Sequence, residues 1–168
     1  IAINGELKRL YIADVRQHQI VVINSETGEH LFDIGKRGKE GGALNFPTNI
    51  TIDQKGNLYI TDYQGRVQIF GPDGQFIKAF GKMGDQPGMF ARPKGIGIDS
   101  EGHIYIADAA FNNVQIFDSE GRILMPFGGP GDGRGEMVLP AGLAIDSEDR
   151  IYVTDQLNQR VNVYQYMG

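Results

Sequence analysis

Four aspartates at matching positions are the first residues of this chain that could do chemistry together. They are Asp14, Asp62, Asp108 and Asp155, and each ends a short apolar run such as LYIT or IYIA. Carboxylates gathered on one rim could hold a cation, and a compact calcium site needs about six oxygens within 2.3–2.6 Å. One aspartate per repeat is better suited to capping the loop that follows it. We therefore predict loop-capping aspartates and no metal site.

The three histidines do not complete a metal or catalytic centre. His18 lies in a loop at one end of its repeat, whereas His30 and His103 fall at turns or strand ends on the opposite side. A structural zinc site needs about four converging ligands, and the chain has no cysteine to supply any. No Ser/His/Asp set stands in a recognisable context, and no GxxxxGK[ST] phosphate loop is present. The sequence predicts no cofactor.

These residues belong to a repeat of 46 or 47 residues. Pro47, Pro93 and Pro140 are separated by these two steps, and so are the last three aspartates of the series. The copies cover residues 1–35, 46–81, 92–128 and 139–168, with the front of the first copy and the end of the last one missing. Spacing this regular is typical of a repeat architecture, and we predict one repeat domain over residues 1–168.

Each copy contains four short apolar runs. In the second copy they are Asn49–Ile52, Leu58–Thr61, Val67–Phe70 and Phe76–Phe80. Their length and their β-branched and aromatic residues favour strands, and Asp-to-Gly connections such as DQKG and DSEG favour hairpin turns. The sequence therefore predicts four antiparallel strands per copy.

The runs differ in their expected burial. The nearly continuous apolar second run predicts a strand deep in the stack. The third run alternates, as in VQIF, which predicts one buried and one partly wet face. Pro126 lies in the fourth run of the third copy, and proline is tolerated on edge strands. The fourth strand should therefore be outermost.

Four-stranded antiparallel units repeated every 40–50 residues describe β-propeller blades. The pattern P…I-D…G-x-I/L-Y-I-x-D…V-Q-I-F…G resembles the NHL repeat of six-bladed β-propellers over essentially the whole chain. Asn112 and Asn158 hold the Asn place of the signature, and no copy has the full Asn-His-Leu triplet. The chain supplies about three and three-quarter blades. We expect a fragment of a six-bladed ring; an open arc that pairs with a second copy and a four-bladed closure are the alternatives.

Two sets of loops should share one face, because the strands alternate in direction. One set joins the copies (residues 35–45, 81–90 and 128–138), and the other joins the second and third strands (residues 14–19, 62–65, 108–113 and 155–159). These loops vary between copies while the strands do not, and such variation on a constant scaffold indicates a binding surface. The predicted contact residues are Arg16, His18, Tyr63, Arg92, Lys94, Phe111, Asn112, Leu157 and Asn158.

The resemblance to NHL proteins implies a non-catalytic module that presents this loop face to a protein or peptide, whose identity the sequence does not give. An enzyme is the alternative. Related propeller lactonases and the amidating lyase place polar ligands around the central channel, and the matching positions here are Thr48–Asn49, Lys94–Gly95 and Ala141–Gly142. Only Asn49 would suit a cation, so such a site would need blades missing from this chain.

Single-stranded RNA binding is the third alternative, since some NHL proteins bind RNA. The cations that could contact phosphates are Arg66, Arg92, Lys94 and Arg160. The net charge of −5 and the pI of about 5.1 give no general attraction to nucleic acid or an anionic membrane. Nucleic acid is therefore the weakest expectation.

Membrane insertion is not expected, since no apolar run approaches the roughly 18–20 residues that cross a bilayer. The chain opens in the middle of its pattern at Ile1. An upstream signal would place it in a secreted or periplasmic location, and the sequence leaves the compartment open. Unpaired blade edges favour association, so a homo-oligomer is a further expectation.

Overall fold

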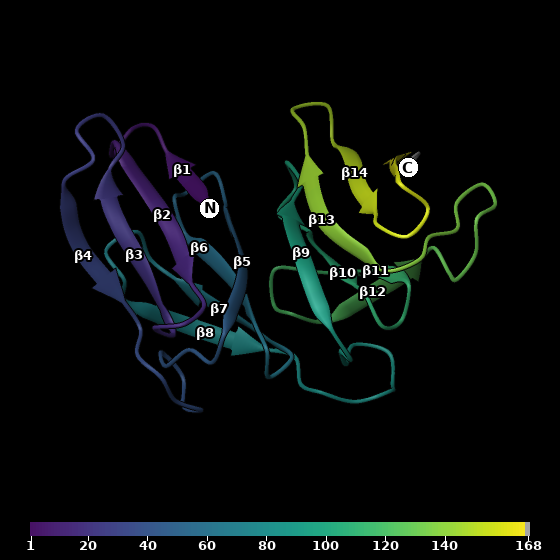
Figure 1. Ribbon diagram of the computed structural model, residues 1–168, viewed down its shortest axis with the longest axis horizontal. Helices are drawn as coiled ribbons and strands as arrows, with labels where there is room; N and C mark the ends of the chain where they lie inside the picture. Colours follow the sequence, from purple (N-terminus) through teal and green to yellow (C-terminus); the bar gives the residue numbers. More distant parts are fainter. Residues whose placement is uncertain (167–168) are drawn as a thin grey trace. The chain divides into compact units, whose positions relative to one another are not determined.

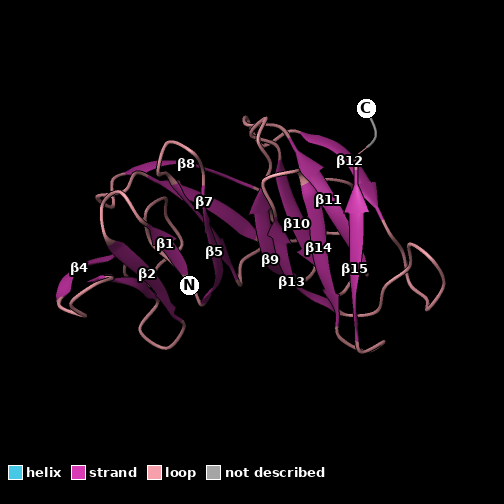
Figure 2. Cartoon of the chain, turned by 90° about the horizontal axis from the view of Figure 1, so that it is seen from above, coloured by secondary structure: helices cyan, strands magenta, loops and turns pink. Residues whose placement is uncertain are grey.

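The computed structural model describes residues 1–166, which form strands in four antiparallel sheets with no helix among them (Figure 1; Figure 2). Each sheet coincides with one copy of the repeat and is called a blade. The first blade contains β1 (Ala2–Asn4), β2 (Arg9–Asp14), β3 (Gln19–Asn24) and β4 (His30–Ile34). The second contains β5 (Pro47–Ile52), β6 (Leu58–Asp62), β7 (Arg66–Phe70) and β8 (Phe76–Phe80).

The last two blades continue this order. The third contains β9 (Pro93–Ile98), β10 (Ile104–Asp108), β11 (Asn113–Phe117) and β12 (Ile123–Phe127). The fourth contains β13 (Pro140–Ile145), β14 (Arg150–Asp155) and β15 (Arg160–Gln165). Within residues 1–166, nothing helical is long or apolar enough to cross a membrane.

Consecutive strands pair in each blade, so the strand order follows the sequence. The predicted all-β fold of four-stranded antiparallel units is confirmed. The strand bounds of the second blade extend the predicted runs by two residues or fewer, because Pro47, Asp62 and Arg66 join the ladder. The fourth strand is outermost as predicted, and Pro126 lies on such an edge strand.

The second strands β6 and β10 are buried throughout, as predicted, whereas β2 and β14 are only partly buried. The prediction of one wet face on the third strands is wrong for β7 and β11, where both faces are buried. The polar residues of that face explain the difference. Gln68 accepts a hydrogen bond from Gly42 N at 3.0 Å and donates to Ala43 O at 2.6 Å. Its amide is satisfied by the preceding loop and does not need water.

The chain divides into two compact units, Ile1–Phe80 and Gly81–Gly168, each containing two blades. In the first unit, Tyr11, Ile20 and Val22 of the first blade share a core with apolar residues of the second. In the second unit, Val114 of the third blade shares a core with Val153 of the fourth. Pairs of stacked sheets thus bury the apolar residues of each unit.

A glycine controls how closely β9 and β13 approach in the second unit, where Figure 1 shows them side by side. A Cβ atom on Gly95 would lie 2.5 Å from Leu143 N and 2.8 Å from Ala141 O. Both atoms belong to the backbone and cannot swing aside. Only a residue without a side chain permits this contact.

Aspartates build the turns between the first and second strands, as predicted. Asp53 Oδ1 accepts hydrogen bonds from Lys55 N and Asn57 N, and its Oδ2 accepts one from Tyr59 OH at 3.2 Å. The same pattern recurs at Asp99 and Asp146 in the later blades. These carboxylates hold turns and strand ends together.

Candidate functional site

The hairpins between second and third strands lie beside the loops that precede each blade. Tyr63 N donates to Asn45 O at 3.0 Å, Ala109 N to Arg92 O at 3.0 Å, and Leu157 N to Val138 O at 3.2 Å. We call these hairpins and loops the loop rim of each unit: residues 14–19, 35–46 and 62–66 in the first unit, and residues 81–92, 108–113, 128–139 and 155–160 in the second. In the second, third and fourth blades, both sets of loops lie at one end of the blade, as predicted.

The aspartates that end the second strands cap the hairpins of the loop rim. Asp14 Oδ1 accepts from Arg16 N and Gln17 N at 3.0 Å. Asp108 Oδ1 accepts likewise from the backbone two and three residues later. The loop-capping interpretation is confirmed, and among residues 1–166 no group of histidines and carboxylates is arranged to hold a metal.

Arginines at the start of two third strands tie the hairpin to the preceding loop. Arg160 Nε donates to Asp155 Oδ2 at 2.9 Å, and the Asp155 side chain is 0 % exposed. Burial by itself raises the pKa of Asp155, but hydrogen bonds from Val138 N, Asn158 and Arg160 outweigh it and lower the pKa. Arg66 pairs with Asp62 at 2.6 Å in the same way. Both guanidinium groups, which the RNA interpretation would need, are engaged inside the protein.

His18 and Asn112 occupy one position of the hairpin turn and perform the same task. Both have a positive φ, of 57° and 54°, which is rare outside glycine and least unfavourable for residues such as Asn. His18 Nδ1 accepts from Phe46 N at 3.0 Å, and Asn112 Oδ1 accepts from Leu139 N at 2.9 Å. Each side chain therefore fixes the residue before the proline that opens the next blade.

The prediction that Asn112 and Asn158 hold equivalent places is wrong. Asn112 is the fourth residue after its aspartate and Asn158 only the third, and Gln159 is the residue that shares the φ of 54°. Asn158 instead donates to Gly131 O at 2.9 Å and to Asp155 at 2.8 Å. It therefore anchors the loop before its own blade.

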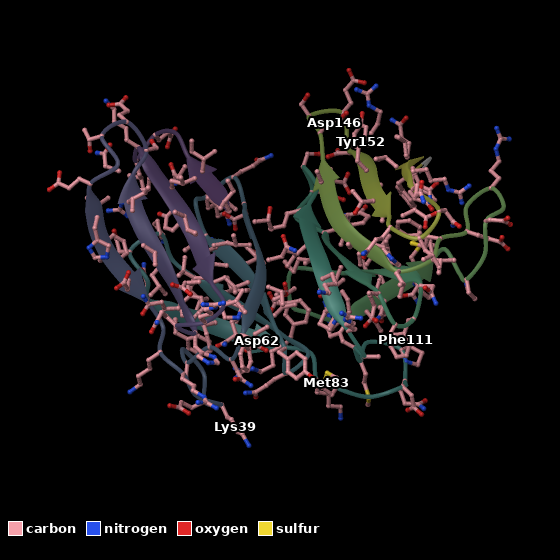
Figure 3. All side chains as sticks on the ribbon, viewed as in Figure 1. Lys39, Asp62, Met83, Phe111, Asp146 and Tyr152 are labelled. Carbon is pink, nitrogen blue, oxygen red and sulfur yellow. The ribbon has the colours of Figure 1, made fainter. Side chains whose placement is uncertain are left out.

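The nine predicted contact residues differ in their solvent exposure. Arg16, Tyr63, Arg92 and Leu157 are exposed, whereas His18 is buried and Lys94, Phe111, Asn112 and Asn158 are partly buried. Figure 3 shows Phe111 and Met83 at the loop end of the second unit, and Asp146 and Tyr152 at its opposite end. Tyr63 and Leu157 are the most exposed apolar residues of the hairpins, at 69 % and 63 %.

The positions suggested by the enzyme resemblance are occupied by structural contacts. Thr48 Oγ1 lies 3.0 Å from Thr61 Oγ1 on the neighbouring strand. Gly95 packs against backbone atoms of β13, and Gly142 N donates to Thr154 Oγ1 at 2.6 Å.

A cavity of about 630 Å³ lies at the opposite end of the second unit. Two of its carboxylates are engaged: Asp99 lies 2.9 Å from His103 Nδ1 within its own turn, and Asp149 accepts from Ser100 N of the neighbouring blade at 2.8 Å. Burial, together with the negative charge of Asp99, raises the pKa of Tyr105. Repeat spacing did not predict the Ser100–Asp149 contact, because it joins two different blades.

Comparison with known proteins places this architecture among β-propellers. Residues 100–168 match a family model described as a 6-bladed beta-propeller. No curated protein is similar enough in sequence to count as a match. The similarity therefore rests on this segment and on solved structures.

Three solved structures illustrate the likeness. A Bacteroides thetaiotaomicron protein of unknown function aligns with a TM-score of 0.75 and 18 % identity, over 97 % of this chain and 46 % of its own. Virginiamycin B lyase from Staphylococcus aureus aligns with a TM-score of 0.63 and 14 % identity, over 95 % of this chain and 53 % of its own. Myxococcus xanthus glutaminyl cyclase aligns with a TM-score of 0.63 and 16 % identity, over 98 % of this chain and 72 % of its own. The chain spans about half the length of the first two, and the likeness shows a propeller fold.

Proposed function

We propose that this chain is a non-catalytic segment of an NHL-type propeller, one domain over residues 1–168, that presents its loop rim to a protein or peptide partner. The observation that carries the proposal is that polar and apolar side chains of the loop rim differ in their exposure. The aspartates that end the second strands, Arg66, Arg160 and His18 bond inward, while apolar side chains at hairpin tips are exposed. No cofactor forms part of the proposal.

Exposed apolar residues recur in three of the four hairpins; in the third, Phe111 is only partly exposed. Val15 and Tyr63 directly follow their capping aspartates and are 43 % and 69 % exposed, and Leu157 follows two residues after Asp155 at 63 %. Single exposed hydrophobic residues are common. Their recurrence at the tips of otherwise self-satisfied, rigidly held loops supports a surface for contact with another macromolecule.

Catalysis is not part of this proposal. The likeness to lyases and a cyclase lies at 18 % identity or below, which supports a fold and carries no activity, since one fold hosts many functions. RNA binding is a weaker candidate because Arg66 and Arg160 already donate to carboxylates and loop carbonyls. Phosphates would have to displace these partners.

A peptide-display selection on the full chain tests the proposal. We expect selected peptides to lose at least tenfold in affinity for the Tyr63→Asp/Leu157→Asp variant, measured by biolayer interferometry. The thermal midpoint should stay within a few degrees, because exposed substitutions change stability by about 0.5 kcal/mol or less. Ser147→Asp, exposed at the opposite end, is the matched control. Failure to select any peptide, or equal binding by both variants, would contradict the proposal.

A further inference from the structure

The second and fourth blades each have an arginine at the same position of the loop rim. Arg66 donates through its guanidinium to three carbonyl oxygens of the preceding loop, and Arg160 donates to the three carbonyls at the matching positions. The first set is Lys39 O, Glu40 O and Ala43 O; the second is Asp132 O, Gly133 O and Glu136 O. Identical partners in two blades define a guanidinium cradle built from loop backbone.

The third blade has the cradle position without the cation. Asn113 lies opposite Asp108 in the ladder, as Arg66 lies opposite Asp62 and Arg160 opposite Asp155. The loop carbonyls at the matching positions belong to Asp85, Gln86 and Met89. Met89 O accepts from Gln115 Nε2 and Gln86 O accepts from Met89 N. Asn113, the counterpart of Arg66 and Arg160, has no guanidinium to donate to these oxygens.

Asn113 leaves an acceptor without a donor at this place. Its Oδ1 is a buried side-chain oxygen with no hydrogen-bond partner, and a buried polar atom left unpaired costs about 1–3 kcal/mol. The neighbouring Asp108 is 0 % exposed and accepts only from backbone N–H groups, those of Ala91, Arg92, Ala110 and Phe111. The place therefore combines acceptors with a buried negative charge, and the residue that matches Arg66 and Arg160 contributes no guanidinium to it.

We propose that the third blade binds the guanidinium of an arginine side chain from the partner. The inference rests on the proposed function, because it names the chemistry by which a protein or peptide would engage the same rim. A guanidinium suits the place better than an ammonium, since it is the group that the two sister cradles hold. Its planar fork of donors matches several fixed acceptors at once. The net charge of −5 favours the approach of a cationic peptide.

Blocked arginine tests the cradle directly. Titrating N-acetyl-arginine-N-methylamide into the full chain should saturably shift the side-chain amide resonance of Gln115, whose Nε2 donates to Met89 O, with a Kd on the order of 1 mM or weaker. The neutral citrulline analogue should shift it at least tenfold less, because it lacks the charge. No saturable shift, or equal shifts with citrulline, would mean that the place holds water only and would overturn the proposal.

Two variants separate the cradle from general charge effects. Asn113→Arg should raise the thermal midpoint and abolish the blocked-arginine response, because an internal guanidinium then fills the cradle. Gln19→Arg adds the same charge at the matching position of the first blade and should leave the response unchanged. An unchanged response in Asn113→Arg would overturn the proposal even if that variant is stable.

Selected peptides distinguish this inference from the proposed function. Peptides that bind the wild-type rim should share an arginine whose replacement by citrulline lowers affinity about tenfold or more. Peptides that need Tyr63 and Leu157 but no arginine would leave the proposed function standing and overturn the inference. If no peptide is selected, the proposed function fails, and the blocked-arginine titration alone decides whether the cradle exists.

Discussion

The imidazole of His18 both accepts a hydrogen bond from Phe46, 28 residues further along the chain, and packs against its ring at a tilt of 59°. Its Nδ1 accepts from Phe46 N at 3.0 Å, and the two ring centroids are 4.3 Å apart. Phe46 has a φ of 50°, a left-handed conformation that bulky residues rarely adopt. The hairpin of the first blade thus holds a strained residue at the entrance to the second.

His18→Ala should lower the free energy of unfolding by about 1–3 kcal/mol, because it removes a buried acceptor and ring packing. His18→Asn should restore part of this loss, since Asn112 performs the same task for Leu139. Urea unfolding of both variants measures the difference. Equal destabilisation by Ala and Asn would show that the hydrogen bond contributes nothing and that packing alone matters.

Arg160→Ala should destabilise the protein by about 2–3 kcal/mol, because the fully buried Asp155 loses its cationic partner. The value is below that of a fully buried pair because Arg160 is 34 % exposed and partly screened by water. Arg122→Ala is the control, since Arg122 pairs with Asp118 at 2.7 Å but is 78 % exposed. Thermal unfolding of both variants is the measurement, and equal effects would contradict a structural role for Arg160.

Alkaline pH should destabilise the fold through Tyr59. Burial first, and then the charge of Asp53, raises the pKa of Tyr59 to about 12. A folded pKa above the unfolded value of about 10 gives stability that is fully present below pH 10 and lost as the pH rises through about 12. Between roughly pH 8 and pH 11, wild type should therefore lose more stability in urea unfolding than Tyr59→Phe. Equal losses would show that Tyr59 is not the responsible group.

The outer face of β15 should cause self-association of this chain. Val161 and Val163 are 56 % and 55 % exposed, whereas the matching Val114 and Ile116 of β11 are buried at 0 % and 7 %. Light scattering should show a mass that rises with concentration, and Val161→Lys/Val163→Lys should keep the chain monomeric. Gln165→Lys, on the same strand, is the control. A wild type that stays monomeric at every concentration would contradict the prediction.

The strands and turns were predictable because their signals are local. An apolar run such as LYIT and a turn such as DQKG each lie within a few residues, and the copies repeat them in register. The burial of both faces of β7 was not predictable, because Gln68 finds its partners in Gly42 and Ala43, about 25 residues earlier. Alternation alone indicates a polar face and does not tell which group satisfies it.

The roles of the rim residues depend on contacts across similar distances. Nothing near His18 in the sequence indicates that it bonds to Phe46, so an exposed contact residue was the natural interpretation. One signal was present, however. Aligned on the valine that follows (Val67, Val114 and Val161), the copies read Arg66, Asn113 and Arg160 in one column. The replacement of a cation by an amide in the third copy marks the place that we propose as the cradle.

The reach of Arg160 also determines which residues a self-contained blade must include. The Asp53–Tyr59 turn is complete within seven consecutive residues, so a blade cut at its first proline retains it. Arg160, in contrast, bonds carbonyls of Asp132 and Glu136 in the loop before its blade. A blade cut at its first proline would lack these acceptors. A self-contained unit therefore begins at the loop glycines Gly35, Gly81 and Gly128, whose spacing of 46 and 47 residues matches the repeat.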